Sequence, residues 1–307
     1  MRIDGPKDDA TRTSGLVEFD FYGDYAAENK AKIQMRHAYL QIDWPEDNFS
    51  ILAGQTSDVT SPLYPSTLNY TVLWDAGNIG YRRPQIRLTK GLKLAEDVDL
   101  KLEGAVARTI GRDNTLTPKS ESGEDAGHPT VQARLGLTLP WLEYKPTTAG
   151  VSGHVGREEY DVLASGENKK FDSWSANLDL TQPIDKWLTV KGELFTGENL
   201  GTYLGGIGQG VNTTTLKEIA SKGGWVAASL GPWSKWNFNV GAGVDDVDRG
   251  DVSSGGRTLN SAVFGNFVYS VNKDTQIGFE LSQWHTAYKG QVDADDTRAQ
   301  MSLTYKF

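Results

Sequence analysis

The segment "YRRPQIRLT" at 81–89 places Arg83, Gln85 and Arg87 at every second position. In an extended strand, side chains at i, i+2 and i+4 point to the same face, so these three would project together. Guanidinium groups bind carboxylates through two parallel hydrogen bonds and stay charged at any physiological pH. The spacing therefore predicts a row of donors that attracts and orients anions.

Further charges of alternating sign occupy the same parity in other extended segments, and Arg36 joins them although the parity of its segment slips. A water-filled lining that carries both signs of charge is the alternative interpretation for any one of them, because such a charge need not affect selectivity. The predicted lining set is Arg36, Arg83, Gln85, Arg87, Lys101, Glu103, Arg134, Lys191, Glu193 and Arg298.

Catalytic and metal-binding patterns are weak. The four histidines stand far apart, none lies beside a recognisable Ser or Cys nucleophile motif, and the chain has no cysteine. The acidic runs at 245–251 and 293–296 could hold Ca²⁺, but we favour the interpretation that they are solvated acidic loop tips. "GGIGQG" at 205–210 lacks the strand–helix context of a nucleotide loop, and we interpret it as a flexible loop. We predict no enzyme activity, no metal and no cofactor.

The elements that would position these charges are strands. Apolar and polar residues alternate with period 2 in a long series of segments, as in "DLKLEGAVA" and in the last eleven residues, "TRAQMSLTYKF". We predict strands at 14–25, 32–43, 48–56, 78–90, 96–109, 129–140, 147–158, 171–182, 187–198, 222–230, 235–246, 257–270, 274–287 and 295–307.

The connections alternate between short and long. Short ones are "WPED", "GLKLAE", "WLEYKP", "PIDK", "GPWSK" and "VNKD"; longer polar segments lie near 57–77, 110–128, 158–171, 199–221, 246–257 and 288–294. A bacterial outer-membrane barrel sorts its loops in this way, with short periplasmic turns and long external loops. The fold class is therefore all-β, a transmembrane antiparallel β-barrel that forms a single domain over 1–307.

"MRID" is predicted to end a preceding strand, with a short turn at 5–15. Since single-chain barrels have an even number of strands, we expect sixteen in the full protein, with part of the N-terminal region missing from this chain. A fourteen-stranded barrel with an N-terminal tail is the alternative. The formal charge of −9 and the pI of about 5.0 argue against nucleic acid as a partner.

The segment 57–77 is the candidate constriction loop, because it combines two prolines with aromatic and polar residues. The alternative is a loop that contacts a neighbouring subunit. The residues of this loop that we predict to form the constriction are Asp58, Tyr64, Tyr70, Trp74 and Asp75.

Aromatic residues gather in or beside the short turns, as expected of a belt at one membrane interface. A soluble core capped by turn aromatics is the alternative. The predicted interface set is Trp44, Trp141, Trp187, Trp233, Trp236 and the terminal Phe307.

Four segments, "LVEFDFYGD" at 16–24, "MRHAYLQI" at 35–42, "ILAGQT" at 51–56 and "YRRPQIRLT" at 81–89, resemble the DcaP-like trimeric porins of the outer membrane. They cover about the first third of the chain. The resemblance implies a homotrimer that passes small solutes, with a leaning toward organic anions such as dicarboxylates. It also implies an N-terminal extension and early strands that are absent here, and a terminal Phe307 that is read by the barrel-assembly machinery.

The sequence thus predicts a porin in the bacterial outer membrane, surrounded by lipid and lipopolysaccharide, for passive diffusion of small hydrophilic and anionic solutes. An outer-membrane β-barrel enzyme of the lipase or protease type is the first alternative, and it requires a His within hydrogen-bond reach of an activated Ser. A soluble β-rich adhesin is the second, and it leaves the sorting of the loops unexplained.

Overall fold

The computed structural model describes residues 1–8, 10–23, 31–110, 126–162 and 167–307. Fifteen strands pair in chain order as one antiparallel sheet, with β1 and β17 at its two edges. The strands are β1 (Arg2–Lys7), β2 (Arg12–Asp20), β3 (Gln34–Trp44), β4 (Phe49–Ser57), β5 (Arg82–Ala95), β6 (Val98–Ala107), β7 (Thr130–Leu139), β8 (Thr147–Val162), β9 (Glu167–Pro183), β10 (Leu188–Glu198), β13 (Ala220–Trp233), β14 (Trp236–Val247), β15 (Arg257–Ser270), β16 (Thr275–Tyr288) and β17 (Ala294–Tyr305).

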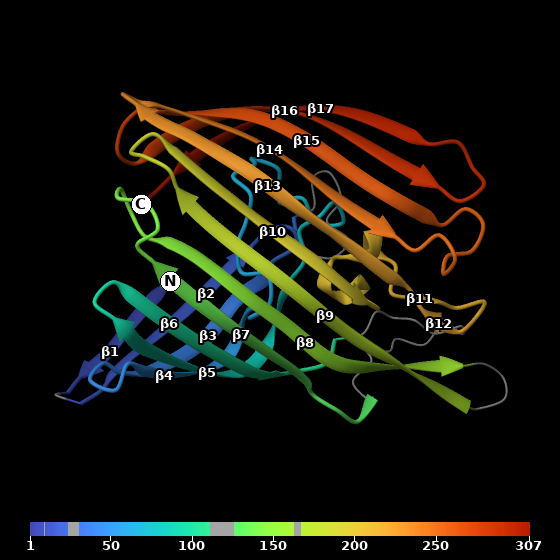
Figure 1. Cartoon of the computed structure of the whole chain (residues 1–307), viewed down its shortest axis with the longest axis horizontal. Helices are drawn as coiled ribbons and strands as arrows, with labels where there is room; N and C mark the ends of the chain where they lie inside the picture. Colours follow the sequence, from blue (N-terminus) through green and yellow to red (C-terminus); the bar gives the residue numbers. More distant parts are fainter. Residues whose placement is uncertain (9, 24–30, 111–125, 163–166) are drawn as a thin grey trace.

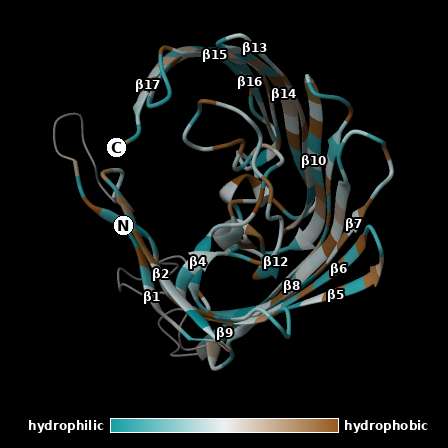
Figure 2. Cartoon of the chain, turned by 90° about the vertical axis from the view of Figure 1, so that its left-hand side faces the viewer, coloured by the Kyte–Doolittle hydropathy of each residue, from teal (hydrophilic) through white to brown (hydrophobic). Residues whose placement is uncertain are grey.

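The sheet curls around a space that is occupied by connecting segments, as the view from the end with the short turns shows (Figure 2). Along each strand, apolar residues that face outward alternate with polar residues that face the interior. On β10, for example, Leu194 is 61% exposed on the outside while its neighbour Glu193 is buried inside. A surface that is apolar on the outside and polar within is the pattern of a transmembrane barrel.

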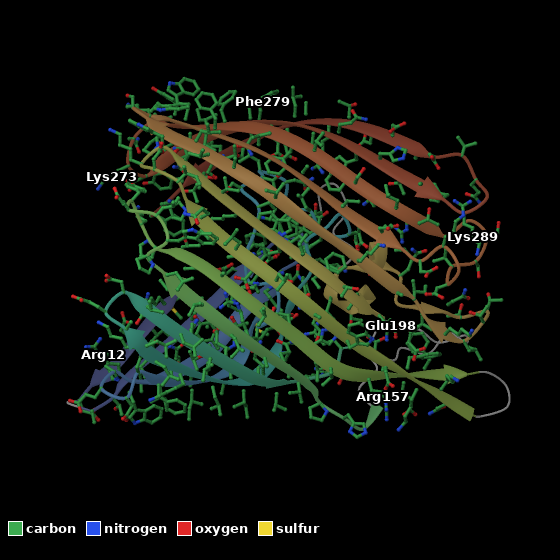
Figure 3. All side chains as sticks on the ribbon, in the orientation of Figure 1. Arg12, Arg157, Glu198, Lys273, Phe279 and Lys289 are labelled. Atoms are coloured by element: carbon green, nitrogen blue, oxygen red, sulfur yellow. The ribbon has the colours of Figure 1, made fainter. Side chains whose placement is uncertain are left out.

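The two ends of the barrel differ in their connections. Short turns lie at the end marked by Arg12 and Lys273, and longer segments lie at the end marked by Lys289 (Figures 1 and 3). All fourteen predicted strands are present, and the predicted end of a preceding strand is β1. No helix in the described part of the chain is long and apolar enough to cross a membrane.

Several predicted boundaries are wrong. The short turn predicted at 5–15 is much shorter, because β1 continues to Lys7 and β2 begins at Arg12. The segment 158–171 was expected to be a long loop, but β8 continues to Val162 and β9 begins at Glu167, so the hairpin extends further. "GLKLAE" was expected to be a connection, but β5 continues to Ala95. At the ends of β8 and β9, backbone pairing continues after the apolar alternation has stopped, which hydropathy alone does not reveal. In β5 the outward alternation continues through Leu92 and Leu94, so this segment was wrongly assigned to the connection.

The long connection between β10 and β13 is folded rather than open. It contains two short 3₁₀ helices, η2 (Gly201–Tyr203) and η3 (Gly206–Gly208), and a small hairpin of β11 (Val211–Asn212) and β12 (Lys217–Glu218). Ile207 is buried with Val247 and Val252. The interpretation of 205–210 as a flexible loop is therefore wrong.

Candidate functional site: the lumen loop and the wall that it faces

The segment 58–81, here called the lumen loop, runs inside the curl of the sheet and is held by polar side chains of the inner wall. The Leu63 N–H donates to Glu193 Oε1 (2.8 Å), and the Thr67 hydroxyl donates to the Glu280 carboxylate (2.8 Å). Asn260 Nδ2 donates to the Asp75 carbonyl oxygen (2.7 Å). The loop is thus tied to strands β10, β15 and β16.

Close backbone packing reinforces these bonds. Gly77 has φ +111°, and a Cβ at this position would lie 2.1 Å from the Gly224 carbonyl oxygen on β13. Only glycine tolerates both this backbone conformation and such an approach. Beside it, Leu73 and Ala76 pack with Trp225 of β13 in the largest interior apolar cluster. The loop therefore lies directly on the wall along this part of its path.

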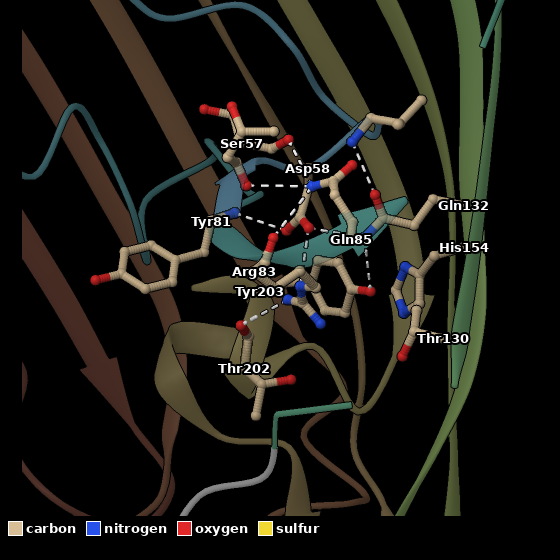
Figure 4. Close-up of polar contacts among 12 residues, drawn as sticks. Ser57, Asp58, Tyr81, Arg83, Gln85, Thr130, Gln132, His154, Thr202 and Tyr203 are labelled. Atoms are coloured by element: carbon tan, nitrogen blue, oxygen red, sulfur yellow. Dashed lines mark hydrogen bonds and ion pairs between the residues drawn. The ribbon is translucent and has the colours of Figure 1, made fainter. Parts of the chain in front are cut away.

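At its start the lumen loop is fixed by a buried ion pair (Figure 4). Arg83 Nε lies 2.8 Å from Asp58 Oδ1, and both side chains are 1% exposed. The guanidinium carbon is 3.9 Å from the centre of the Tyr203 ring, and Arg83 donates to the Thr202 carbonyl oxygen (3.2 Å). Gln132 Nε2 donates to Asp58 Oδ1 (2.7 Å), which completes the cluster. We refer to this cluster as the latch.

The latch corrects the prediction for the arginine row. Arg83, Gln85 and Arg87 do share one face of β5, while Ile86 and Leu88 are exposed on the other. However, Arg83 is sealed in the latch, and Gln85 is buried with its amide donating to the Thr56 and Ser57 carbonyl oxygens. Only Arg87 remains partly exposed, with its guanidinium bonded to Gln85 and Ser57. A row of three free donors is therefore wrong.

Tyr203 and His154 were not singled out from the sequence as site residues. Their rings stack at 3.8 Å, and His154 also hydrogen-bonds to Ser175 (2.8 Å) and Ser173 (2.9 Å). Burial raises the pKa of the Tyr203 phenol, so it stays neutral over the cation of Arg83. Tyr203 belongs to a loop whose sequence carries no signal for this contact.

Four strands contribute a line of charges to the inner wall. Glu103 of β6 lies between Lys101 Nζ (2.9 Å) and Arg134 Nη1 (3.4 Å), with Arg87 Nη1 at 4.0 Å. Arg134 of β7 reaches across β8 to Asp179 of β9 (2.6 Å). We refer to this line as the wall ladder.

The long reach of Arg134 depends on Gly150, which stands between the two partners on β8. A Cβ at this position would lie 2.4 Å from Asp179 Oδ2 and 2.5 Å from Arg134 Nη2. The missing side chain thus leaves the space that the ion pair occupies.

The remaining predicted lining residues have different surroundings. Glu193 is not a free lining charge, because it is buried and binds Leu63 of the loop and the Trp225 indole N–H (3.1 Å). Lys191 shares its face of β10 and is half-buried, and no ion-pair partner is found for it among the described residues. Arg298 is exposed on the edge strand β17.

Arg36 lies at a β-bulge, which explains why its parity could not be assigned. The register of β2 and β3 shifts between Glu18 and Phe19, leaving Arg36 as the extra residue. Its guanidinium pairs with Glu18 (2.7 Å) and Asp20 (3.0 Å) and approaches the Tyr70 hydroxyl of the lumen loop (3.3 Å).

The five predicted constriction residues of the loop do not lie together. Asp58 belongs to the latch, whereas Tyr70, Trp74 and Asp75 line a cavity of 760 Å³ near the ends of β2 and β3. Tyr64 is outside that cavity, with its hydroxyl 3.5 Å from Ser57 Oγ.

The predicted interface aromatics lie at the end with the short turns. Trp187 and Trp233 are neighbours (6.2 Å between ring centres), and Trp236 packs with Tyr269 (4.6 Å). Trp44 packs on Phe49 (5.5 Å). Trp141 and Phe307 are exposed.

The described residues contain no group of three or more His, Cys, Asp and Glu placed to hold a metal ion. The acidic run 245–251 is not a solvated loop tip throughout, since Asp245 is buried and accepts from the Ile207 N–H (3.2 Å). The structure therefore assigns a structural role to the first carboxylate of that run.

Solved structures of outer-membrane channels resemble this chain. The DcaP channel of Acinetobacter baumannii superposes with a TM-score of 0.77 at 17% identity, over 99% of this chain and 83% of that one. OmpF of Salmonella typhi, in complex with daunomycin, gives 0.64 at 11% identity over 100% and 88%. An anion-selective porin from Comamonas acidovorans gives 0.58 at 11% identity over 99% and 86%. No protein-family model and no curated protein matches the sequence. These likenesses establish the fold, which is a porin-type barrel.

Proposed function

We propose that this chain forms an outer-membrane channel for passive diffusion of small hydrophilic solutes, with a preference for organic anions such as dicarboxylates. The observation that carries the proposal is the lumen loop, a polar and aromatic segment tied along the inner wall of a barrel whose outer face is apolar. A loop folded inward narrows a lumen, and the charges beside it then act on every solute that passes.

The preference for anions is supported by the charges of the inner wall next to the loop. The wall ladder together with Lys191 carries four cations, Lys101, Arg87, Arg134 and Lys191, and two carboxylates, Glu103 and Asp179, an excess of two (four minus two). Two further carboxylates of the wall, Glu193 and Glu280, are bonded to the lumen loop and are not part of this count. In a water-filled lumen such an excess steers anions without binding them tightly, because solvent and salt screen it. A dicarboxylate carries two negative charges, so this field attracts it about twice as strongly as it attracts a monocarboxylate.

A planar-bilayer measurement of reversal potential under a salt gradient tests this proposal. The informative variant is Lys101→Ala with Lys191→Ala, because these two cations are the least engaged in the fold. The control is Lys186→Ala with Lys273→Ala, which removes the same charge from the short turns outside the lumen. We expect anion selectivity in the parent and in the control, and a clear fall in the lumen variant. Cation selectivity in the parent would refute the anion preference, and absence of conductance would refute the channel.

A barrel enzyme is disfavoured by the surroundings of the one His–Ser cluster in the described residues. His154 is 3% exposed, both ring nitrogens are occupied by serine hydroxyls, and Tyr203 covers the ring. A catalytic base needs access to substrate and an orienting acceptor on its second nitrogen. This cluster is buried and gives its imidazole no access to substrate, so we interpret it as part of the interior packing.

The proposal extends to assembly and location. We expect a homotrimer in the outer membrane, in line with a trimer form described for OmpT of Vibrio cholerae, whose fold is similar (TM-score 0.59, 12% identity, 99% of this chain and 90% of that one). The aromatic residues at the end with the short turns would contact the lipid interface there, and lipopolysaccharide would contact the opposite end. The exposed Phe307 would be available to the assembly machinery.

A further inference from the structure

The cavity of 760 Å³ lies apart from the wall ladder, between the end of β2, the start of β3 and the lumen loop. Its lining includes Tyr22, Gln34, Tyr70, Trp74 and Tyr81, and Leu204 of the loop between β10 and β13. Apart from Gln34 at the start of β3, its lining residues belong to the connections between β2 and β3, between β4 and β5, and between β10 and β13, at the end with the long loops. Its volume falls within the range of pockets that bind small molecules, which is about 300–1,000 Å³.

Four of the residues that line this cavity are aromatic: Tyr22, Tyr70, Trp74 and Tyr81. Tyr22 and Tyr70 lie 4.6 Å apart between ring centres, Tyr70 and Trp74 meet edge to face at 6.4 Å, and Trp74 and Tyr81 meet edge to face at 5.4 Å. Tyr22 is 65% exposed and Tyr70 is 37% exposed, so both present ring surface to a solute.

These rings are held in place by polar contacts around the cavity. The Tyr70 hydroxyl donates to Asp20 Oδ2 (2.9 Å), and the Tyr81 hydroxyl accepts from Gln34 Nε2 (2.6 Å). The backbone of Tyr22 is bridged to Lys32. A ligand would therefore meet a surface that is already ordered and would lose less free energy in immobilising it.

Two arginines near the cavity, Arg36 and Arg82, are engaged by other side chains of the protein. Arg36 is paired with Glu18 and Asp20. Arg82 is buried, with its guanidinium 4.6 Å from the centre of the Tyr81 ring and 5.9 Å from that of Trp74. Asp75 is the only acidic or basic residue among the described residues of the lining. The described lining of the cavity thus contains no lysine or arginine, in contrast to the wall ladder.

We propose that this cavity binds a neutral oligosaccharide. A pyranose ring has an apolar C–H face that packs on aromatic rings, and hydroxyl groups that hydrogen-bond to amide, hydroxyl and carboxylate groups. The lining supplies both, with the Tyr22 and Tyr70 rings beside Gln34, Thr71 and Asp75. The proposal goes beyond diffusion, because it assigns a binding site at the mouth whose occupancy does not depend on the charge of the wall.

Calorimetric titration of the detergent-folded protein with maltotriose tests this site, and block of the ionic current in bilayers by the same sugar gives a second readout. The variant is Tyr22→Ala with Tyr70→Ala. The matched control is Tyr64→Ala, which removes a tyrosine of the same loop with nearly the same exposure, 38%. A further variant, Tyr70→Phe, keeps the ring and loses the bond to Asp20.

We expect maltotriose to bind and to block current, with affinity about tenfold lower in the double variant and within about threefold of the parent in the other two. A neutral hexose oligosaccharide of the lipopolysaccharide outer core, here called the core oligosaccharide, serves as a second probe. If it binds more tightly than maltotriose, the glycan comes from the membrane rather than from solution, and the site still binds sugar.

Three results would overturn the proposal. The first is that neither maltotriose nor the core oligosaccharide gives a heat of binding or blocks the ionic current. The second is that Tyr64→Ala loses as much affinity for maltotriose as the double variant does. The third is that benzoate, an aromatic anion, binds more tightly than either sugar. Conductance in plain salt is recorded in the same bilayers, so failure of the sugar site is distinguished from failure of the channel.

Discussion

Removal of the negative charge from the latch should release the lumen loop while the barrel stays folded. In Asp58→Asn, the Arg83 guanidinium would stay buried without its paired carboxylate. The Thr202 carbonyl oxygen and the Tyr203 ring would remain beside it, with the Glu158 carboxylate as a more distant charge. Removing one partner of a buried ion pair costs about 3–5 kcal/mol. The asparagine keeps an acceptor for Gln132, while its amide group replaces the oxygen that accepts the Tyr81 N–H (2.9 Å), so we expect a loss of at least roughly 3 kcal/mol.

Hydrogen exchange of the loop amides, measured by mass spectrometry on the folded protein in detergent, reports this change. Since tenfold corresponds to about 1.4 kcal/mol, exchange of amides such as Val59 and Gly80 should accelerate by roughly 150-fold through local opening. The strands should keep their protection. The double variant Asp58→Asn with Arg83→Met removes the unpaired cation and should restore most of the loss, with a coupling of about 2 kcal/mol.

The matched control is Asp172→Asn, which breaks the exposed pair with Arg157 (2.8 Å, with the Asp172 side chain 67% exposed). An exposed pair contributes at most about 1 kcal/mol, so loop exchange should not change. If loop exchange in Asp58→Asn stays within threefold of the parent, or if the double variant exchanges as fast as the single one, then the ion pair does not hold the loop.

Three further changes test other contacts. Gly77→Val places a side chain against a carbonyl oxygen of β13 at φ +111°, so the loop should leave the wall and single-channel conductance should rise; unchanged conductance would contradict the close packing. Gly150→Leu overfills the space of the ion pair that crosses β8 and should lower stability by about 1–3 kcal/mol, measured by urea unfolding in vesicles. Val240→Arg places a charge on the outer face and should lower the free energy of unfolding by about 2–4 kcal/mol in the same assay. Asn239→Arg, on the inner face, should lower it by about 1 kcal/mol, and equal losses in the two variants would contradict the assignment of the faces.

The strands could be predicted from sequence because a barrel in lipid imposes one strict rule, alternation of apolar and polar residues, over a fixed length. That rule stops where the wall leaves the membrane, which is why the extensions of β8 and β9 were missed. It also fails at a bulge, where one extra residue changes the face, as at Arg36.

The contacts of the interior could not be read in this way. Arg83 was correctly placed on the inner face, but its burial depends on Thr202, 119 residues further along, and on the ring of Tyr203. Parity indicates which way a side chain points and carries no information on what covers it. The same limit applies to Glu193, whose partner Leu63 lies 130 residues earlier.

The bond between Thr67 and Glu280 joins positions 213 residues apart. Contacts of such separation form late in folding, because the chain between them must first be ordered. The lumen loop can therefore take its final path only after β16 has joined the sheet. Until then Glu280 and Asn266 face an unfilled interior, and a barrel at that stage of assembly would be leakier than the finished one. If the chain forms the proposed channel, narrowing of its pore would follow the pairing of β16, and the interior would be wider until then.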